Sequence, residues 1–96
     1  MGDQYSKYFE WDEVKEESNF LKHGVSFLEA SSVFLDEEGI FISDPDHSEH
    51  EDRFLLIGMS STSRMLVVSH CFRKERIRLI SARKATKREP ETLPGF

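Results

Sequence analysis

Cysteine, proline, glycine and long apolar runs are all scarce in this sequence. Its one cysteine, Cys71, has no second cysteine to pair with, so an internal disulfide is excluded. No apolar run is long enough to cross a bilayer, and the N-terminus Met1–Tyr5 has neither the basic start nor the apolar stretch of a secretory signal. We therefore expect a cytoplasmic protein with no membrane association.

Sequence motifs for nucleotide or serine-nucleophile chemistry are also missing. There is no glycine-rich phosphate-binding loop and no G-x-S-x-G turn. The acidic segment Asp44–Asp52 also contains His47 and His50, but its spacing matches no established zinc or calcium site. Pro45 and the alternating charges favour a solvated loop over a metal-binding loop. We expect neither a metal nor a cofactor.

Charges are unevenly distributed along the chain, although the net charge is only −5. Residues 1–52 contain 15 acidic and 3 basic side chains, a balance of −12, whereas residues 53–96 contain 10 basic and 3 acidic side chains, a balance of +7. A concentrated group of cations attracts anions whatever the total charge. The C-terminal half is therefore a candidate nucleic-acid surface, although mutual neutralisation of the two halves explains the pattern equally well.

Signals for a short strand and two helices occupy the first third of the chain. The aromatic-rich string Tyr8–Trp11 indicates a strand. Asp12 suits a helix N-cap and Gly24 a left-handed stop, which predicts a helix over about residues 12–23. The string Ser26–Glu29 matches a capping box, which predicts a second helix through about Phe34. The residues that carry the helical spacing of the first segment are Trp11, Val14, Ser18 and Leu21.

The remaining residues predict a β-rich half. Turn residues separate the apolar strings, and the short connections favour hairpins in an antiparallel meander. The polar loop Asp44–Asp52 follows the first of these strings, and Lys84–Glu89 predicts a short helix that stops near Pro90. The predicted strands are Ile40–Ile42, Phe54–Met59, Met65–Phe72 and Arg76–Ala82.

Together these elements predict an α+β fold. The length suits one domain over residues 1–96 with a single core, and we expect residues 1–6 and 91–96 to be flexible. The predicted architecture is a twisted antiparallel β-sheet with two N-terminal helices packed on one face and a short C-terminal helix.

The last predicted strand concentrates cations on one face. Arg76 and Arg78 alternate with Ile77 and Leu79, so period-two spacing places both arginines on the same side. Guanidinium groups bind phosphate with forked geometry, which makes this face a candidate RNA surface. An arginine-rich face that only maintains solubility fits the same pattern. The neighbouring cations are Arg73, Lys74, Arg83, Lys84, Lys87 and Arg88.

Two histidines are candidates for proton transfer. Lys22 and His23 precede Gly24, where they either supply a proton-transfer group and a phosphate clamp or simply complement the helix dipole. His70 lies among apolar residues of a predicted strand, which is more typical of a hydrogen-bonded core residue than of a catalyst. The local sequence leaves these alternatives open.

Several strings, taken in order, resemble the BrnT family of type II toxins from about Tyr8 to Glu89. Each string is weak alone, but their order and spacing together are specific. The strings are Phe9-Glu10-Trp11-Asp12, Asn19, Lys22-His23-Gly24-Val25-Ser26-Phe27, Glu29-Ala30, Asp44-Pro45-Asp46-His47-Ser48, Arg53-Phe54, Ile57-Gly58, Arg64, Leu66-Val67-Val68 and Arg76 to Thr86.

The resemblance implies a RelE-like fold and a ribonuclease toxin that cleaves RNA and arrests growth. It also implies a BrnA-like antitoxin with a ribbon-helix-helix DNA-binding region, a complex with two copies of each protein, and contact with operator DNA only through the antitoxin. The implied chemistry is metal-independent, because the 2′-hydroxyl of the RNA itself attacks the adjacent phosphate.

Under this resemblance, the candidate site residues divide by role. Stabilisation of the phosphorane charge is assigned to Arg53, Arg78 and Arg83, assisted by Lys22. Proton transfer is assigned to His23 or His70. Binding of backbone phosphates is assigned to Arg73, Arg76 and Lys84.

The C-terminus departs from the family pattern. Pro90 interrupts the last helix, and the tail Thr92–Phe96 lacks the tyrosine that family members often carry near the end. This departure keeps a second hypothesis open, in which the chain is a catalytically inactive module that binds the antitoxin and acts only in promoter autorepression. A metal-binding or purely structural domain built on the acidic loop is a third.

Overall fold

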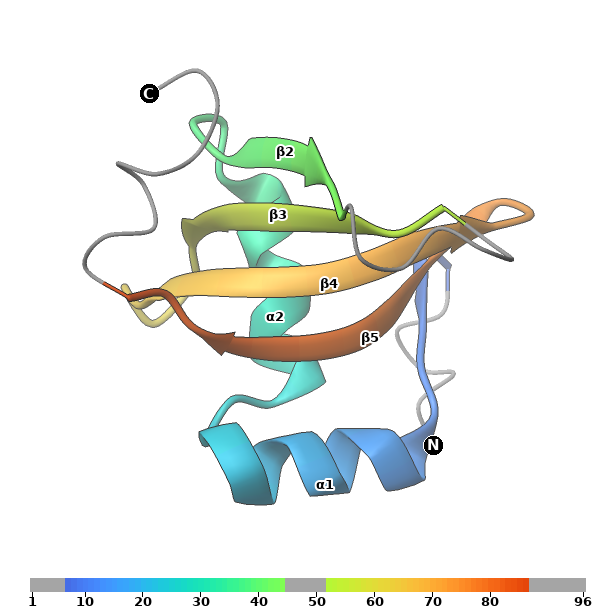
Figure 1. Cartoon of the computed structure of the whole chain (residues 1–96), viewed down its shortest axis with the longest axis horizontal. Helices are drawn as coiled ribbons and strands as arrows, with labels where there is room; N and C mark the ends of the chain where they lie inside the picture. Colours follow the sequence, from blue (N-terminus) through green and yellow to red (C-terminus); the bar gives the residue numbers. More distant parts are fainter. Residues whose placement is uncertain (1–6, 45–51, 87–96) are drawn as a thin grey trace.

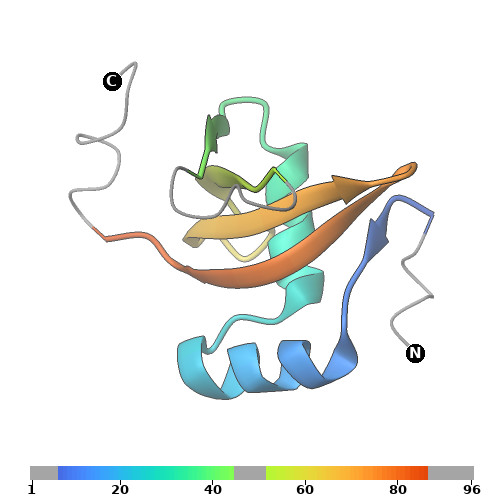
Figure 2. The same ribbon diagram turned by 45° about the vertical axis from the view of Figure 1, so that its right-hand side comes forward.

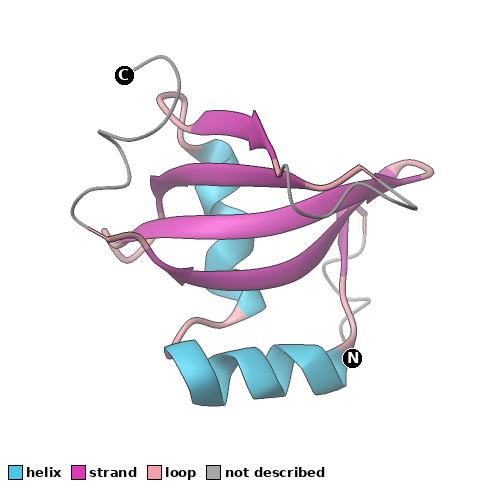
Figure 3. Ribbon diagram, viewed as in Figure 1, coloured by secondary structure: helices cyan, strands magenta, loops and turns pink. Residues whose placement is uncertain are grey.

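The computed structural model describes residues 7–44 and 52–86, and within these ranges the chain forms an α+β fold (Figures 1 and 3). Two helices precede most of the strands, as the sequence predicts, and a short 3₁₀ turn replaces the last residues of the second predicted helix. The predicted flexibility of residues 1–6 and 91–96 lies outside the described residues, as does most of the Asp44–Asp52 loop. The elements are β1 (Phe9–Glu10), α1 (Glu13–His23), α2 (Phe27–Ser32), η2 (Val33–Leu35), β2 (Ile40–Ser43), β3 (Phe54–Met59), β4 (Met65–Arg73) and β5 (Arg76–Lys84).

The described strands form one five-stranded sheet in the order β1-β5-β4-β3-β2. The four strands from β2 to β5 are an antiparallel meander, as predicted from their short connections. The prediction of a wholly antiparallel sheet is wrong, because β1 pairs with β5 in parallel. The chain enters the sheet at β1 and returns to it through both helices, so the direction of this pair depends on tertiary packing.

A β-bulge divides β5 into two halves. Ser69 pairs with Ser81 whereas the next residue, His70, pairs with Leu79, so Ile80 is the extra residue. Leu79 and Ala82 are both buried in the core although they are three residues apart. The bulge therefore resets the alternation of side chains along β5, which the sequence did not predict.

α2 covers one face of the sheet and is attached by burial of its own side chains (Figure 1). Ser26 Oγ accepts a hydrogen bond from Glu29 N at 3.0 Å, as the capping box predicts. Phe27 and Ala30 on α2 are fully buried. At Gly58 of β3, an added Cβ would lie 3.0 Å from a methyl of Val33, which follows α2, so this segment packs closely against the sheet. The buried core comprises Val25, Phe27, Ala30, Val33, Leu56, Leu66, Val68, Leu79 and Ala82.

α1 begins and ends as predicted, but its apolar residues face outward. Asp12 caps Val14 N at 2.8 Å, and Gly24 ends the helix with φ of 70°. An apolar stripe at helical spacing normally faces the core. Here Val14 is 78% exposed and Leu21 79% exposed, whereas the buried residue of the helix is Asn19. The inward face of α1 is therefore polar.

Asn19 attaches α1 to the edge of β5. Its side-chain amide donates to Ala82 O at 2.9 Å and accepts from Ala82 N at 3.0 Å, in the way that a neighbouring strand would pair. It also donates to Val25 O at 3.0 Å. α1 consequently runs beside β5 rather than across the sheet (Figures 1 and 2), so the prediction that both helices pack on one face is wrong.

The predicted C-terminal helix is wrong where the structure describes it. Lys84 belongs to β5, and Ala85 and Thr86 are not helical. Ala85 N donates to Met65 O at 2.9 Å, so pairing with β4 continues to this point. Backbone hydrogen bonds to a neighbouring strand prevent the residues from turning into a helix. Residues 87–89 lie outside the described part of the chain.

Candidate nucleic-acid interface

Three arginines of β5 share the sheet face opposite α2. Arg78 neighbours the buried Leu79, and Arg83 neighbours the buried Ala82, so both arginines point away from the core. Arg76 shares the face of Arg78 by simple alternation, as the sequence predicts. Arg83 joins them only because the bulge at Ile80 shifts the alternation by one residue. We call this surface the arginine face.

One end of the arginine face is hollowed where β4 turns into β5. The turn is tight, since Arg73 pairs with Arg76 and Lys74 adopts a positive φ of 55°. A cleft of about 930 Å³ lies beside this turn. Its lining residues are Glu10, Arg73, Lys74, Glu75 and Arg76. We call it the hairpin cleft, and its three cations outnumber its two carboxylates, which favours an anionic ligand.

Glu10 and Arg78 form an ion pair at this cleft. Glu10 pairs with Arg78 in the parallel register of β1 and β5, and Arg78 Nη1 donates to Glu10 Oε2 at 2.8 Å. Both side chains are about a quarter exposed, at 26% and 27%, so both remain accessible to a ligand. The carboxylate restricts the orientation of the guanidinium. Our sequence reasoning missed Glu10, because the string Tyr8–Trp11 does not show which strand it joins.

Arg53 lies on the same row of the sheet as Arg78. It immediately precedes β3, and its carbonyl accepts from Asp44 N at 2.8 Å, which extends the pairing of β2 and β3. The next residue, Phe54, pairs with His70, and Cys71 pairs with Arg78. Two strand spacings therefore separate Arg53 from Arg78, or about 10 Å between their backbones.

Four other predicted residues gather at the opposite end of β5. Lys22 and His23 end α1, whose Asn19 is bonded to Ala82, next to Arg83. Arg83 pairs with Val67, and Arg78 pairs with Cys71. Because these two partners are four residues apart on β4, Arg83 and Arg78 are separated by roughly 13 Å along the strands. The structure thus separates the predicted cations into two groups. The group at this end, which we call the α1-end group, consists of Lys22, His23, Arg83 and Lys84. Lys84 pairs with the core residue Leu66, so it lies on the opposite face of β5 from Arg83.

His70 lies apart from both groups, on the face that α2 covers. It is fully buried, and its Nδ1 is 3.1 Å from Val68 O. Burial lowers the pKa of His70, so the ring is neutral near neutral pH. Nε2 has no hydrogen-bond partner among the described residues. The rings of Phe34, Phe41, Phe54 and Phe72 surround it at 4.9–6.0 Å. Direct contact of His70 with RNA would require these rings to move.

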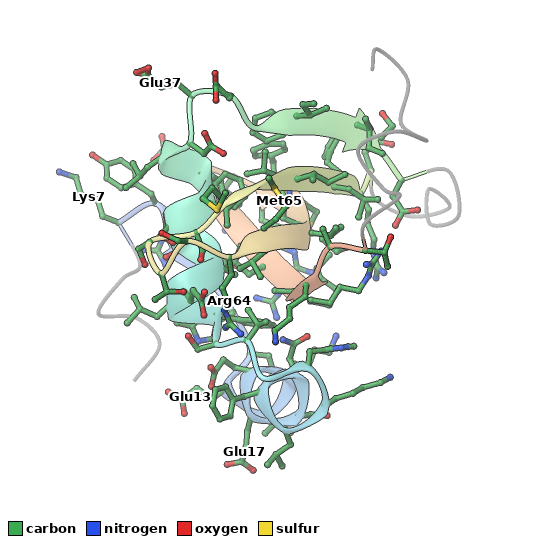
Figure 4. All side chains as sticks on the ribbon, turned by 90° about the vertical axis from the view of Figure 1, so that its left-hand side faces the viewer. Lys7, Glu13, Glu17, Glu37, Arg64 and Met65 are labelled. Atoms are coloured by element: carbon green, nitrogen blue, oxygen red, sulfur yellow. The ribbon has the colours of Figure 1, made fainter. Side chains whose placement is uncertain are left out.

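Arg64 is a cation with a structural partner. Its Nε donates to Glu29 Oε2 at 2.9 Å, and its Nη2 donates both to Glu29 Oε1 and, at 3.0 Å, to Gly24 O. Arg64 thereby connects α2 with the end of α1 (Figure 4). Together with the hydroxyls of Thr62 and Ser60, it lowers the pKa of Glu29 from 4.5 to about 2. We therefore do not count Arg64 among the RNA-binding cations.

Neither a metal centre nor a membrane span is evident in residues 7–44 and 52–86. These ranges contain no group of three or more metal-ligating side chains. Their helices are too short and too polar to cross a membrane. The acidic loop that the sequence offers as a metal site lies mostly outside the described residues, with only Asp44 and Asp52 inside them.

The fold and the comparisons together define a ribonuclease toxin. Residues 11–89 match the family described as "Ribonuclease toxin, BrnT, of type II toxin-antitoxin system". The chain belongs to this BrnT family, which implies an antitoxin partner. Among solved structures, it is similar to the Brucella abortus ribonuclease toxin BrnT, with 25% identity and a TM-score of 0.61 over 80% of this chain and 94% of that one. A comparison with curated proteins finds no match.

Proposed function

We propose that this chain cleaves RNA at the hairpin cleft, without a metal ion, through attack by the 2′-hydroxyl of the substrate. The observation that carries the proposal is the Glu10–Arg78 pair at the edge of a cleft that also contains Arg73 and Arg76. A carboxylate beside several guanidinium groups combines a proton acceptor with donors for a phosphate.

The reaction needs only side chains of the protein, which act as the base and the acid. The 2′-oxygen of one nucleotide forms a bond to the adjacent phosphorus, and its proton passes to a base on the protein. The bond between phosphorus and the 5′-oxygen of the next nucleotide then breaks, and this oxygen takes a proton from an acid. The products are a 2′,3′-cyclic phosphate and a 5′-hydroxyl. DNA lacks the attacking hydroxyl, so the reaction is limited to RNA.

The residues divide into those at the cleft and those farther along the strand. Arg78 and Arg53 stabilise the charge of the phosphorane, while Arg73 and Arg76 hold its phosphate. Glu10 orients Arg78 and accepts the proton of the 2′-hydroxyl. The α1-end group binds phosphates further along the same RNA, and its His23 is the second candidate for proton transfer. Its cations are Lys22, Arg83 and Lys84.

The partner in this proposal is a BrnA-like antitoxin with a ribbon-helix-helix region. Such proteins bind DNA as symmetric dimers, which favours a complex of two toxins and two antitoxins. Operator DNA is then contacted only by the antitoxin. The free chain acts in the cytoplasm, where the RNA substrate is found, and the fold is a RelE-like variant.

Cleavage of a short RNA by the purified chain in the presence of EDTA tests the chemistry. We expect cleavage that stops when the 2′-hydroxyl at the cut site is replaced by hydrogen. Arg78→Ala should reduce the rate by about 100-fold or more, since loss of one donor to a transition-state oxyanion has effects of this size. Lys15→Ala, an exposed cation on α1, is the matched control and should cleave normally.

Two further substitutions separate the candidate bases. Glu10→Gln should abolish most cleavage if Glu10 accepts the proton, whereas His23→Gln should then have a small effect. The reverse result would move proton transfer to the α1-end group. If the folded chain neither cleaves RNA nor arrests growth but still binds antitoxin, the inactive autorepression module replaces this proposal.

A further inference from the structure

The outer face of α1 exposes large apolar side chains. Val14 is 78% exposed, Leu21 79% and Phe20 51%. Exposed apolar residues that lie singly are common on protein surfaces, whereas a grouped set on one element marks an interaction site. Val14 and Leu21 are seven residues apart, so both lie on one side of the helix.

Charged residues border this apolar stripe in an ordered way. At 3.6 residues per turn, Glu17 and then Glu13 fall on one side of the stripe, and Phe20 lies beyond them, about 120° around the helix from Val14. Lys15 and Lys22 fall on the other side. Figure 4, which views α1 along its axis, shows Glu17 extending away from the sheet and Glu13 extending to the side of the helix. We call Val14, Leu21, Glu13 and Glu17 the outer α1 face.

The fold itself makes little use of these side chains. The inward side of α1 is attached by Asn19 and by Glu16, whose Oε2 accepts from Phe27 N at 3.3 Å. His23 is half-buried on the same side. The exposed Val14 and Leu21 therefore contribute little to the folded monomer, and their apolar character is left for a partner.

Charge indicates which partner covers the face. Residues 1–52 have a balance of −12, so a second copy of this region would be repelled at long range. A helical segment that carries apolar residues at helical spacing, and basic residues on the side of Glu13 and Glu17, complements both the stripe and its acidic border. The chain belongs to a toxin family that has an antitoxin partner, which is the protein expected to supply such a segment.

We propose that the antitoxin docks a basic amphipathic helix on the outer α1 face. The apolar side of that helix covers Val14 and Leu21, and its basic residues face Glu13 and Glu17. α1 begins three residues after Glu10. A segment bound along α1 therefore ends beside the hairpin cleft and blocks RNA there, so this inhibitory step rests on the proposed function.

The test is calorimetry with the purified antitoxin encoded beside the gene of this chain. The double variant Val14→Ser, Leu21→Ser should bind at least tenfold more weakly than the original chain, because two anchors of the interface are lost. The matched control is Leu35→Ser, since Leu35 is 83% exposed on η2 and lies outside the face. Unchanged thermal unfolding would show that the double variant is folded.

A charge reversal gives a second, independent readout. Glu13→Lys with Glu17→Lys should weaken antitoxin binding and reduce its dependence on salt concentration. Affinity within twofold of the original for both double variants would overturn the proposal, and so would an equal loss in Leu35→Ser. A dimer of the isolated chain that disappears in Val14→Ser, Leu21→Ser would assign the face to a second copy and also overturn it.

Failure of this inference is distinguishable from failure of the proposed chemistry. RNA cleavage by the free chain should be unchanged in Val14→Ser, Leu21→Ser, because neither residue lines the hairpin cleft. If no variant cleaves RNA but antitoxin binding still requires Val14 and Leu21, the cleavage proposal fails and the docking surface stands. If cleavage is confirmed and binding ignores the outer α1 face, the docking surface fails alone.

Discussion

The two helices of this protein are attached to the same sheet by different forces. α2 is held by fully buried apolar side chains, with Phe27 and Ala30 in the core. α1 is held mainly by hydrogen bonds from Asn19 to the edge of β5, while Val14 and Leu21 face solvent. The comparison shows that helical spacing of apolar residues identifies a helix, but does not by itself identify its inward side.

Because the two helices are attached differently, the side chains that stabilise the fold are not the same as those available to bind a partner. A helix attached by polar contacts at an edge can present its apolar side to another molecule. A helix attached by burial has its apolar side chains in the core, where no partner can contact them. α1 thus has a surface to offer a partner that α2 lacks, and substitutions in the two helices should have different effects on unfolding and on binding.

The largest effect on stability is expected from Phe27→Ala in α2. Removal of a fully buried phenylalanine loses apolar burial and leaves a cavity, at a cost of about 3–5 kcal/mol. Denaturant titration followed by circular dichroism would measure this loss. The neighbouring Leu28→Ala, at a residue 49% exposed, is the control and should cost far less. Equal losses would contradict the view that burial holds α2.

A smaller but clear loss is expected from Asn19→Ala in α1. The variant leaves Ala82 N and O without their side-chain partners, which should cost roughly 1–3 kcal/mol. Hydrogen exchange of the Ala82 amide should accelerate together with the loss in unfolding free energy. Ser18→Ala, an exposed neighbour, should change neither quantity. A stable Asn19→Ala variant with a protected Ala82 amide would show that other contacts hold α1.

The contact of Arg64, which precedes β4, with α2 and the end of α1 should weaken in acid. Arg64 lowers the pKa of Glu29 in the folded chain from 4.5 to about 2. The stabilisation is therefore complete above pH 4.5 and is lost as pH falls from 4.5 toward 2. Unfolding free energy measured across this range should fall less steeply in Glu29→Gln than in the original chain. The exposed Glu17→Gln should retain the full slope.

The smallest effect on stability is expected from Val14→Ser with Leu21→Ser. Both side chains are nearly four-fifths exposed, so the unfolding free energy should change by no more than about 0.5 kcal/mol for each. Thermal unfolding would measure it. A loss as large as that of Phe27→Ala would mean that the two helices are attached in the same way, and would remove the contrast between them.

Prediction from the sequence succeeded where the determinants are local. Asp12 and Gly24 set the two ends of α1 and Ser26 sets the start of α2, and each forms the cap that its residue type predicts. The meander from β2 to β5 followed from short connections. The alternation of Arg76 and Arg78 with Ile77 and Leu79 also placed both arginines on one face, as the structure has them.

Prediction failed where a residue's environment depends on distant segments. The parallel pairing of β1 with β5 brings Glu10 next to Arg78, 68 residues along the chain, and no local pattern marks that pair. The bulge at Ile80 brings Arg83 onto the arginine face against simple alternation. Lys84 continues β5 instead of starting a helix, because hydrogen bonds to β4 extend as far as Ala85.

The candidate site shows the same division between features with local determinants and features that depend on distant segments. Sequence reasoning identified the cations, since their residue types and their position on one strand are visible directly. It could not separate the hairpin cleft from the α1-end group, nor reveal that His70 is enclosed by four phenylalanine rings. These facts depend on strand register, which arises from pairing between segments far apart in the chain.

By itself, the sequence determined the helix ends, the meander, the polarity of charge and the family pattern, because caps, turns and composition act over a few residues. Only the tertiary structure decided which side of α1 faces inward, which cations share a cleft and which carboxylate joins them. The physical reason is that a side chain's burial and partners are set by the packing of whole elements, and the Ala82 edge that Asn19 satisfies exists only once β5 has joined the sheet.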